Sequence, residues 1–246
     1  MYKSFIKRHP YLGAILVSLL CTSLTATGAA ISQILQTSES ISYITMTAAV
    51  VISAAIGLFL VRLSGMSFRQ MGLTGGITMN ARRVWFYLPL VIIELIPLVL
   101  RGFEMDFSPE KYLLLVIFTL AVGANEEIYF RGLVIHYLAE KGIKKAIVIS
   151  SVIFGVLHIA TAFGGQKLLP TLLQIIFAFL VGLVLSRIVS LTKRLLPLIL
   201  WHALHNFITY TTMLPEEGIN SIDLNLVIPL LQVVILLVYF IYLWKQ

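Results

Sequence analysis

The chain is dominated by long apolar runs that alternate with short polar segments. A membrane-spanning helix needs ~17–25 mostly apolar residues, because it must cross ~30 Å of hydrocarbon at ~1.5 Å per residue. Eight segments meet this requirement: Tyr11–Leu35, Ile41–Val61, Val84–Leu100, Tyr112–Ala139, Ala146–Phe163, Leu168–Arg187, Leu195–Thr212 and Leu224–Trp244. The pattern predicts an all-α polytopic membrane bundle of eight helices, with residues 1–246 forming one integral membrane domain.

Composition supports this interpretation. Of the 246 residues, 59% are hydrophobic and 12% are charged, whereas a soluble domain carries ~25% charged residues. A water-soluble globule is therefore excluded. The single cysteine, Cys21, rules out an internal disulfide and is expected as a buried thiol of the core.

The basic residues predict the orientation, because Lys and Arg in short loops remain on the cytoplasmic side. With the N-terminus inside, fourteen of them fall in cytoplasmic segments: Lys3, Lys7, Arg8, Arg62, Arg69, Arg82, Arg83, Lys141, Lys144, Lys145, Arg187, Lys193, Arg194 and Lys245. Three fall outside, together with seven acids: Arg101, Lys111 and Lys167, and Glu39, Glu104, Asp106, Glu110, Glu216, Glu217 and Asp223. Both termini are predicted to be cytoplasmic, and the net charge of +7 is an orientation signal rather than a sign of nucleic-acid binding.

Two segments allow a second interpretation. The basic start, apolar run and small residues at Ala26–Ala30 also fit a cleavable signal peptide, although the run is long and its removal would leave seven spans. The stretch Ser64–Asn80 is either an interfacial amphipathic segment or a plain glycine-containing loop.

Four ionisable residues fall inside predicted spans: Glu94, Glu126, Glu127 and Arg131. Such a group costs ~2.5–3.5 kcal/mol at the bilayer centre, so it marks a functional site by default. Glu126 lies ~21 Å from Tyr112 and ~20 Å from Ala139 along its helix, near the midplane. Glu127 and Arg131 are four residues apart and are expected to pair, whereas Glu126 points about 100° away with no basic partner in its helix.

Two later spans bring further polar groups to a comparable depth. His158 is expected ~18 Å into its span, and His202 and Asn206, four residues apart, share one helix face. A desolvated glutamate beside a histidine suits a general base that activates water. A histidine and an amide on one face suit donors to an oxyanion. The chain has no G-x-S-x-G motif and Cys21 has no recognisable base, so a covalent nucleophile is not favoured.

Together the motifs Glu126-Glu127-x-x-x-Arg131, Phe154-x-x-x-His158 and His202-x-x-x-Asn206 resemble the CAAX-protease and bacteriocin-processing (CPBP) family of intramembrane glutamate peptidases. The resemblance covers about residues 112–210. It implies that Glu126 and His158 activate the hydrolytic water and that His202 and Asn206 stabilise the oxyanion. Glu127 and Arg131 would support the site, while His205 and Glu94 match no motif position and are expected to pack or to form a supporting hydrogen bond.

The resemblance further implies hydrolysis without a cofactor or metal. Its substrate would be a membrane-associated peptide or protein, and its partners membrane lipid rather than nucleic acid. The chain length and short loops favour a bacterial cytoplasmic membrane. Three alternatives remain: a zinc site built from two histidines and a glutamate, a proton-coupled transporter using the same buried groups, and a noncatalytic immunity or membrane partner protein.

Overall fold

The computed structural model describes residues 2–74, 81–213 and 223–246, and their regular structure is helical apart from one isolated antiparallel bridge between Phe103 and Thr212. The helices are α1 (Tyr2–Arg8), α2 (Pro10–Ile34), α3 (Glu39–Ser64), α4 (Phe68–Met71), α5 (Ala81–Val84), η1 (Trp85–Tyr87), α6 (Leu88–Arg101), α7 (Pro109–Glu127), η2 (Ile128–Val134), α8 (Ile135–Leu138), η3 (Ala139–Lys141), α9 (Ile143–Leu157), α10 (Ala160–Phe163), α11 (Leu168–Thr192), α12 (Leu196–Thr211) and α13 (Leu224–Trp244). The predicted all-α polytopic bundle is confirmed.

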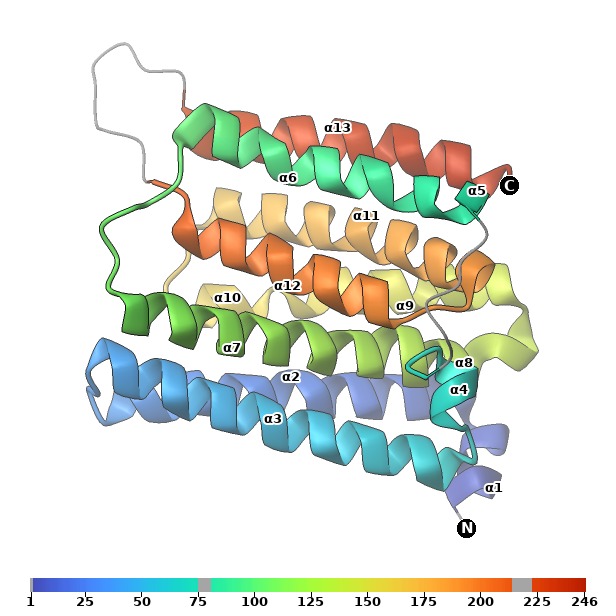
Figure 1. Cartoon of the computed structure of the whole chain (residues 1–246). Helices are drawn as coiled ribbons and strands as arrows, with labels where there is room; N and C mark the ends of the chain where they lie inside the picture. The colour runs from blue at the N-terminus through green and yellow to red at the C-terminus, as the bar shows by residue number, and fades with distance from the viewer. Residues whose placement is uncertain (1, 75–80, 214–222) are drawn as a thin grey trace.

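The long helices lie side by side in a bundle (Figure 1). The α2–α3 hairpin forms one side, α7 packs against it, and α12 packs against α7. On the opposite side α6 and α13 pack together, while α11 contacts both α9 and α13. Helix α7 therefore lies between the amino-terminal hairpin and the rest of the bundle.

Six helical segments are long and apolar enough to cross a membrane: 10–34, 39–64, 109–141, 143–163, 168–192 and 224–244. The other two predicted spans are helices of 14 residues (α6) and 16 residues (α12), below the usual length for a full crossing. A 3₁₀ turn and Pro89 delay the start of α6, and α12 ends where Thr212 enters the bridge to Phe103. The count of eight spans thus stays a prediction.

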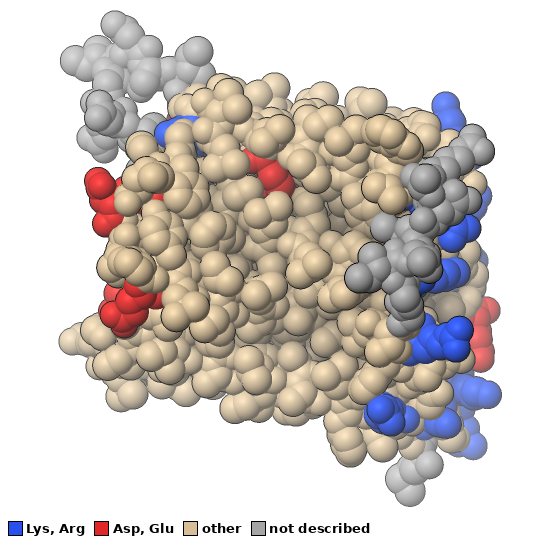
Figure 2. All heavy atoms as spheres, viewed as in Figure 1, with Lys and Arg blue, Asp and Glu red and all other residues tan. Residues whose placement is uncertain are grey.

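Charge is separated between the two ends of the bundle. Lys and Arg gather at the end where both termini lie, and most of the visible Asp and Glu lie at the other end (Figures 1 and 2). We call these the basic end and the acidic end. The cytoplasmic location of the basic end remains a prediction from the positive-inside rule.

The segment Ser64–Asn80 contains the one-turn helix α4. Ser67 and Gln70 form a reciprocal capping box at its start, and Gly72 ends it in the left-handed conformation at φ 84°. Met71 is buried and packs beside Gly132 of η2. Residues 64–74 thus contain a one-turn helix and are not a plain loop throughout, the interfacial location stays a prediction, and residues 75–80 lie outside the described part of the chain.

Candidate active site

The helix that begins at Pro109 changes its winding directly after the two glutamates. Ser108 caps its start by accepting a hydrogen bond from the Lys111 backbone at 3.2 Å. Helix α7 ends at Glu127, and the next seven residues form a π-helix, η2, whose side chains are all buried. Such π-helical turns inside longer helices are frequent at functional sites.

The predicted pair between Glu127 and Arg131 is present and completely buried. Arg131 Nη1 lies 2.9 Å from Glu127 Oε1, and both side chains are 0% exposed. The guanidinium also lies over the Phe154 ring, 4.4 Å from its centroid. Because the two charges have left water together, each depends on the other for compensation.

His202 connects this ion pair to Glu126. Its Nδ1 donates to Glu127 Oε1 at 2.9 Å, and its Nε2 lies 3.6 Å from Glu126 Oε2. The motif spacing did not predict that Glu127 and His202 would bond. This contact needs α7 and α12 to be close, and a Cβ at Gly123 would meet the Ile199 carbonyl oxygen at 2.9 Å. A glycine therefore permits the approach that brings the two motifs together.

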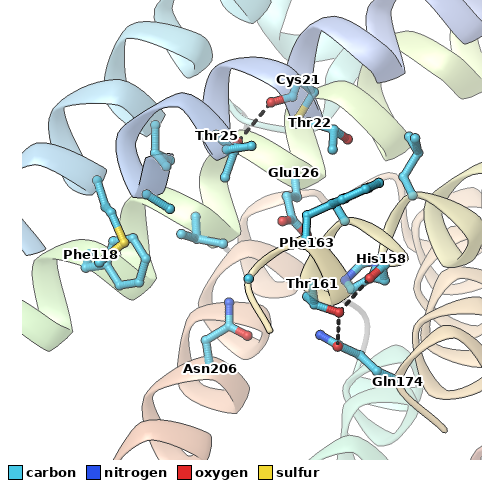
Figure 3. A pocket seen from close by; sticks show the side chains of 18 of the residues that line it. Cys21, Thr22, Thr25, Phe118, Glu126, His158, Thr161, Phe163, Gln174 and Asn206 are labelled. Carbon is cyan, nitrogen blue, oxygen red and sulfur yellow. Dashed lines mark hydrogen bonds between the residues drawn. The ribbon is translucent and has the colours of Figure 1, made fainter. Parts of the chain in front are cut away.

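The four predicted catalytic residues line one cavity of about 490 Å³. Glu126, His158 and Asn206 extend into it from α7, the end of α9 and α12 (Figure 3), and His202 also belongs to its wall. Among the described residues, Glu126 Oε2 is buried without a hydrogen-bond partner. The arrangement thus offers a carboxylate oxygen that can accept a proton from a bound molecule.

His158 is oriented by its own helix. Its Nδ1 lies 2.8 Å from the Phe154 carbonyl oxygen, and its ring meets the Phe154 ring edge-on at 4.8 Å between centroids. A neutral imidazole that donates from Nδ1 keeps Nε2 as an acceptor. The Thr161 hydroxyl donates to the His158 carbonyl at 2.8 Å and also contacts Gln174 (Figure 3).

Sequence reasoning missed the contribution of α2 to this site. Cys21 is buried as expected, at 2% exposed, but it also lines the cavity. The Asn125 amide donates to Cys21 Sγ at 3.3 Å and to Thr25 Oγ1 at 3.1 Å. The polar residue that precedes the two glutamates therefore holds α2 against α7, a role that the position of Asn125 beside them could have suggested.

Glu94 and His205 form a separate pair. His205 Nδ1 lies 3.0 and 3.1 Å from the two Glu94 oxygens, and its ring stacks on Phe177 and Trp201. Neither residue is among those that line the cavity. Their hydrogen bond joins α6 to α12. A supporting hydrogen bond of this kind was expected for these two residues, because they match no motif position.

The described residues of the site are not arranged as a set of metal ligands. Within residues 2–74, 81–213 and 223–246, no group of three or more His, Cys, Asp or Glu side chains is placed to hold a metal ion. The cluster instead joins carboxylates to an imidazole and a guanidinium.

The fold and the buried cluster define a multi-pass membrane protein. Residues 108–208 match a family model described as "Rce1-like: Type II CAAX prenyl endopeptidase Rce1-like". This region, which is less than half of the chain, holds all three motifs and is similar to this family of CAAX intramembrane proteases, within the CPBP group. No curated protein and no solved structure matches the chain.

Proposed function

We propose that this protein is a metal-independent, glutamate-type endopeptidase that hydrolyses a peptide bond of a membrane-associated peptide or protein inside the bilayer. One observation carries the proposal: Glu126, His158, His202 and Asn206 line the same cavity, with the Glu127–Arg131 pair buried behind them. A bacterial cytoplasmic membrane is the location we propose.

In this mechanism Glu126 is the general base. Its carboxylate takes one proton from a water molecule while the water oxygen bonds to the scissile carbonyl carbon. Nε2 of His158 accepts a hydrogen bond from the same water and orients it, since Nδ1 is engaged with the Phe154 carbonyl. The carbonyl electron pair moves to oxygen and forms a tetrahedral oxyanion.

His202 and Asn206 donate hydrogen bonds to that oxyanion. The intermediate then re-forms the carbonyl, the carbon–nitrogen bond breaks, and the departing nitrogen takes the proton held by Glu126. One water is consumed, a carboxyl and an amine are released, and Glu126 returns to the carboxylate form.

The buried charges support the assignment of His202 as a donor. Glu126 and Glu127 carry two negative charges, and Arg131 supplies one positive charge that it cannot lose. With Nδ1 bonded to Glu127, His202 presents Nε2 toward Glu126 and the cavity. Glu127, held by Arg131, thereby acts by positioning His202.

The substitution Glu126→Gln tests this function, because it preserves shape and removes the base. Purified protein in detergent or liposomes is mixed with a library of membrane-associated peptides, and cleavage is followed by mass spectrometry. We expect the variant to fold normally and to lose about 10²–10⁴-fold in rate. Peptides that accumulate in cells carrying Glu126→Gln, relative to wild type, would identify the substrate.

Other outcomes of the same variant favour the other classes. Proton flux in liposomes that disappears with Glu126→Gln would favour a transporter. Full biological activity in cells carrying Glu126→Gln would favour a noncatalytic immunity or membrane partner protein. It would overturn the proposal that the protein is a peptidase.

A further inference from the structure

Gln174 is a polar residue of α11 that the proposed mechanism does not use. It lies near the start of an apolar helix, and residues 175–185, which follow it, have no polar side chain. An amide in a membrane helix has no water on its lipid side, so its hydrogen bonds must come from the protein or from a molecule in a cavity. Gln174 lines the same cavity as Glu126.

The oxygen of the Gln174 amide is held by α10. Thr161 Oγ1 lies 3.0 Å from Gln174 Oε1 and 2.8 Å from the His158 carbonyl oxygen. A threonine hydroxyl has one proton, which these two acceptors share in a three-centre bond. The amide is thereby fixed relative to His158, whose ring orients the hydrolytic water in the proposed mechanism.

The nitrogen of the same amide has no protein partner in the described ranges 2–74, 81–213 and 223–246. The hydrogen bond to Thr161 uses the oxygen only, and Nε2 donates to none of these residues. Figure 3 shows Nε2 turned away from Thr161, on the side of Asn206. An amide nitrogen carries two N–H donors and no acceptor. Gln174 therefore offers donors to an oxygen atom of a molecule in the cavity.

We infer that Gln174 is a substrate-binding residue that donates from Nε2 to a main-chain carbonyl of the bound peptide. The inference rests on the proposed function. A main-chain carbonyl is the acceptor that a peptide carries at every residue, whatever its side chains. His202 and Asn206 serve the scissile carbonyl in the proposed mechanism, so the carbonyl bound by Gln174 belongs to a neighbouring residue.

A contact of this kind is made equally in the ground state and in the transition state. Its loss therefore raises KM and leaves kcat unchanged, whereas loss of an oxyanion donor lowers kcat. Gln174→Met keeps the length of the side chain and removes the donor. We expect KM to rise about 10-fold, the value of one hydrogen bond, for a library peptide that the wild type cleaves.

Gln232→Met is the matched control. Gln232 is a buried glutamine of α13, its Nε2 donates to the Ile93 carbonyl oxygen at 3.4 Å, and it is not among the residues that line the cavity. We expect this variant to lower the melting temperature in detergent and to leave KM near wild type. An equal rise of KM in both variants, or a fall of kcat at constant KM in Gln174→Met, would overturn the inference.

A change in the substrate tests the same contact from the other side. Each peptide bond except the scissile one is replaced in turn by an (E)-alkene, which keeps the shape and lacks the carbonyl oxygen. At one position we expect the wild type to lose about 10-fold in kcat/KM and Gln174→Met to lose nothing further, because the two changes remove one interaction. Additive losses at every position would show that Gln174 binds no main-chain carbonyl. Gln174→Leu repeats the measurement if the methionine variant has a low melting temperature.

Binding without cleavage separates this inference from the proposed function. In a Glu126→Gln background, the dissociation constant of the same peptide, labelled with a fluorophore, should rise about 10-fold on adding Gln174→Met. Cleavage that survives Glu126→Gln would refute the peptidase mechanism, whatever the effect at Gln174. Cleavage that depends on Glu126, with KM and the dissociation constant unchanged by Gln174→Met, would refute the role of Gln174 alone.

Discussion

Helix α12 carries two histidines, less than one turn apart, in opposite surroundings. His202 bonds to Glu127, reaches toward Glu126 and faces a cavity. His205 bonds to both oxygens of Glu94 and is stacked between two aromatic rings. Each histidine is paired with a carboxylate, yet His202 lines the cavity, whereas His205 lies outside the cavity lining and joins α12 to α6.

The difference shows what an ionisable group inside a membrane can mean. Such groups are costly and are by default interpreted as functional. The Glu94–His205 pair satisfies its own hydrogen bonds and joins α6 to α12, so its placement has a structural explanation. In the cavity cluster, Glu126 Oε2 makes no hydrogen bond among the described residues, although His202 Nε2 lies 3.6 Å away, and this placement beside a cavity fits the general base that we propose.

The comparison can be tested by removing one acid from each region. Glu127→Ala leaves the buried Arg131 guanidinium without its ion-pair partner, and arginine cannot become neutral by losing a proton. We expect a loss of about 3–5 kcal/mol in unfolding free energy, with low folded yield and no activity. Glu94→Ala leaves His205 without its hydrogen-bond partner. Because a histidine can be neutral, the loss in unfolding free energy should be smaller, about 1–3 kcal/mol. Thermal unfolding in detergent measures both.

Arg131→Ala should also reduce folded yield together with activity, since Glu127 loses its cation. If Glu127→Ala or Arg131→Ala were as stable as wild type in detergent, the buried ion pair would not be contributing to the stability of the protein.

A second test replaces each of the two histidines in turn by phenylalanine. His202→Phe removes the proposed oxyanion donor and should lower kcat by about 10²–10³-fold. His205→Phe preserves the stacking on Phe177 and Trp201 and should change kcat little while lowering the melting temperature. Equal losses of kcat in the two variants would show that the distinction between the regions is wrong.

The sequence predicted the parts of the site that depend on helical periodicity. The four-residue spacing of Glu127 and Arg131 predicted their pairing, and the equal spacing of His202 and Asn206 predicted a shared face, which both turn toward the cavity. The long apolar runs likewise predicted the helices of the bundle, because hydrocarbon requires internal backbone hydrogen bonding.

Contacts between helices could not be predicted from one sequence. The bond from His202 to Glu127 depends on the α7–α12 approach at Gly123, and the entry of Cys21 into the cavity wall depends on how α2 packs on Asn125. The shortness of α6 and α12 was also missed, because hydropathy reports apolar character and not where the chain ends a helix.

A smaller effect is expected where a donor lines the cavity but carries no buried charge. Asn206→Ala removes the second proposed oxyanion donor, and a loss of about 10–10²-fold in kcat is expected, with KM changed less. Thr209→Ala is the matched control on α12, since its hydroxyl bonds back to the His205 carbonyl of the same helix at 2.9 Å. Steady-state kinetics of both variants would show whether the cavity face of α12 alone carries the chemistry.

The smallest expected effect on the cleavage rate is that of metal chelation. Zinc would have to take its ligands from Glu126, His158 and His202, beside a guanidinium whose positive charge disfavours a second cation. Glu127 Oε1 is already engaged by Arg131 and by His202. We therefore expect 1,10-phenanthroline and EDTA to leave the cleavage rate unchanged. Loss of hydrolysis on chelation, with recovery on adding zinc, would replace the glutamate mechanism by a metal one and would reassign the cavity residues as ligands, while leaving the Glu94–His205 pair in its packing role.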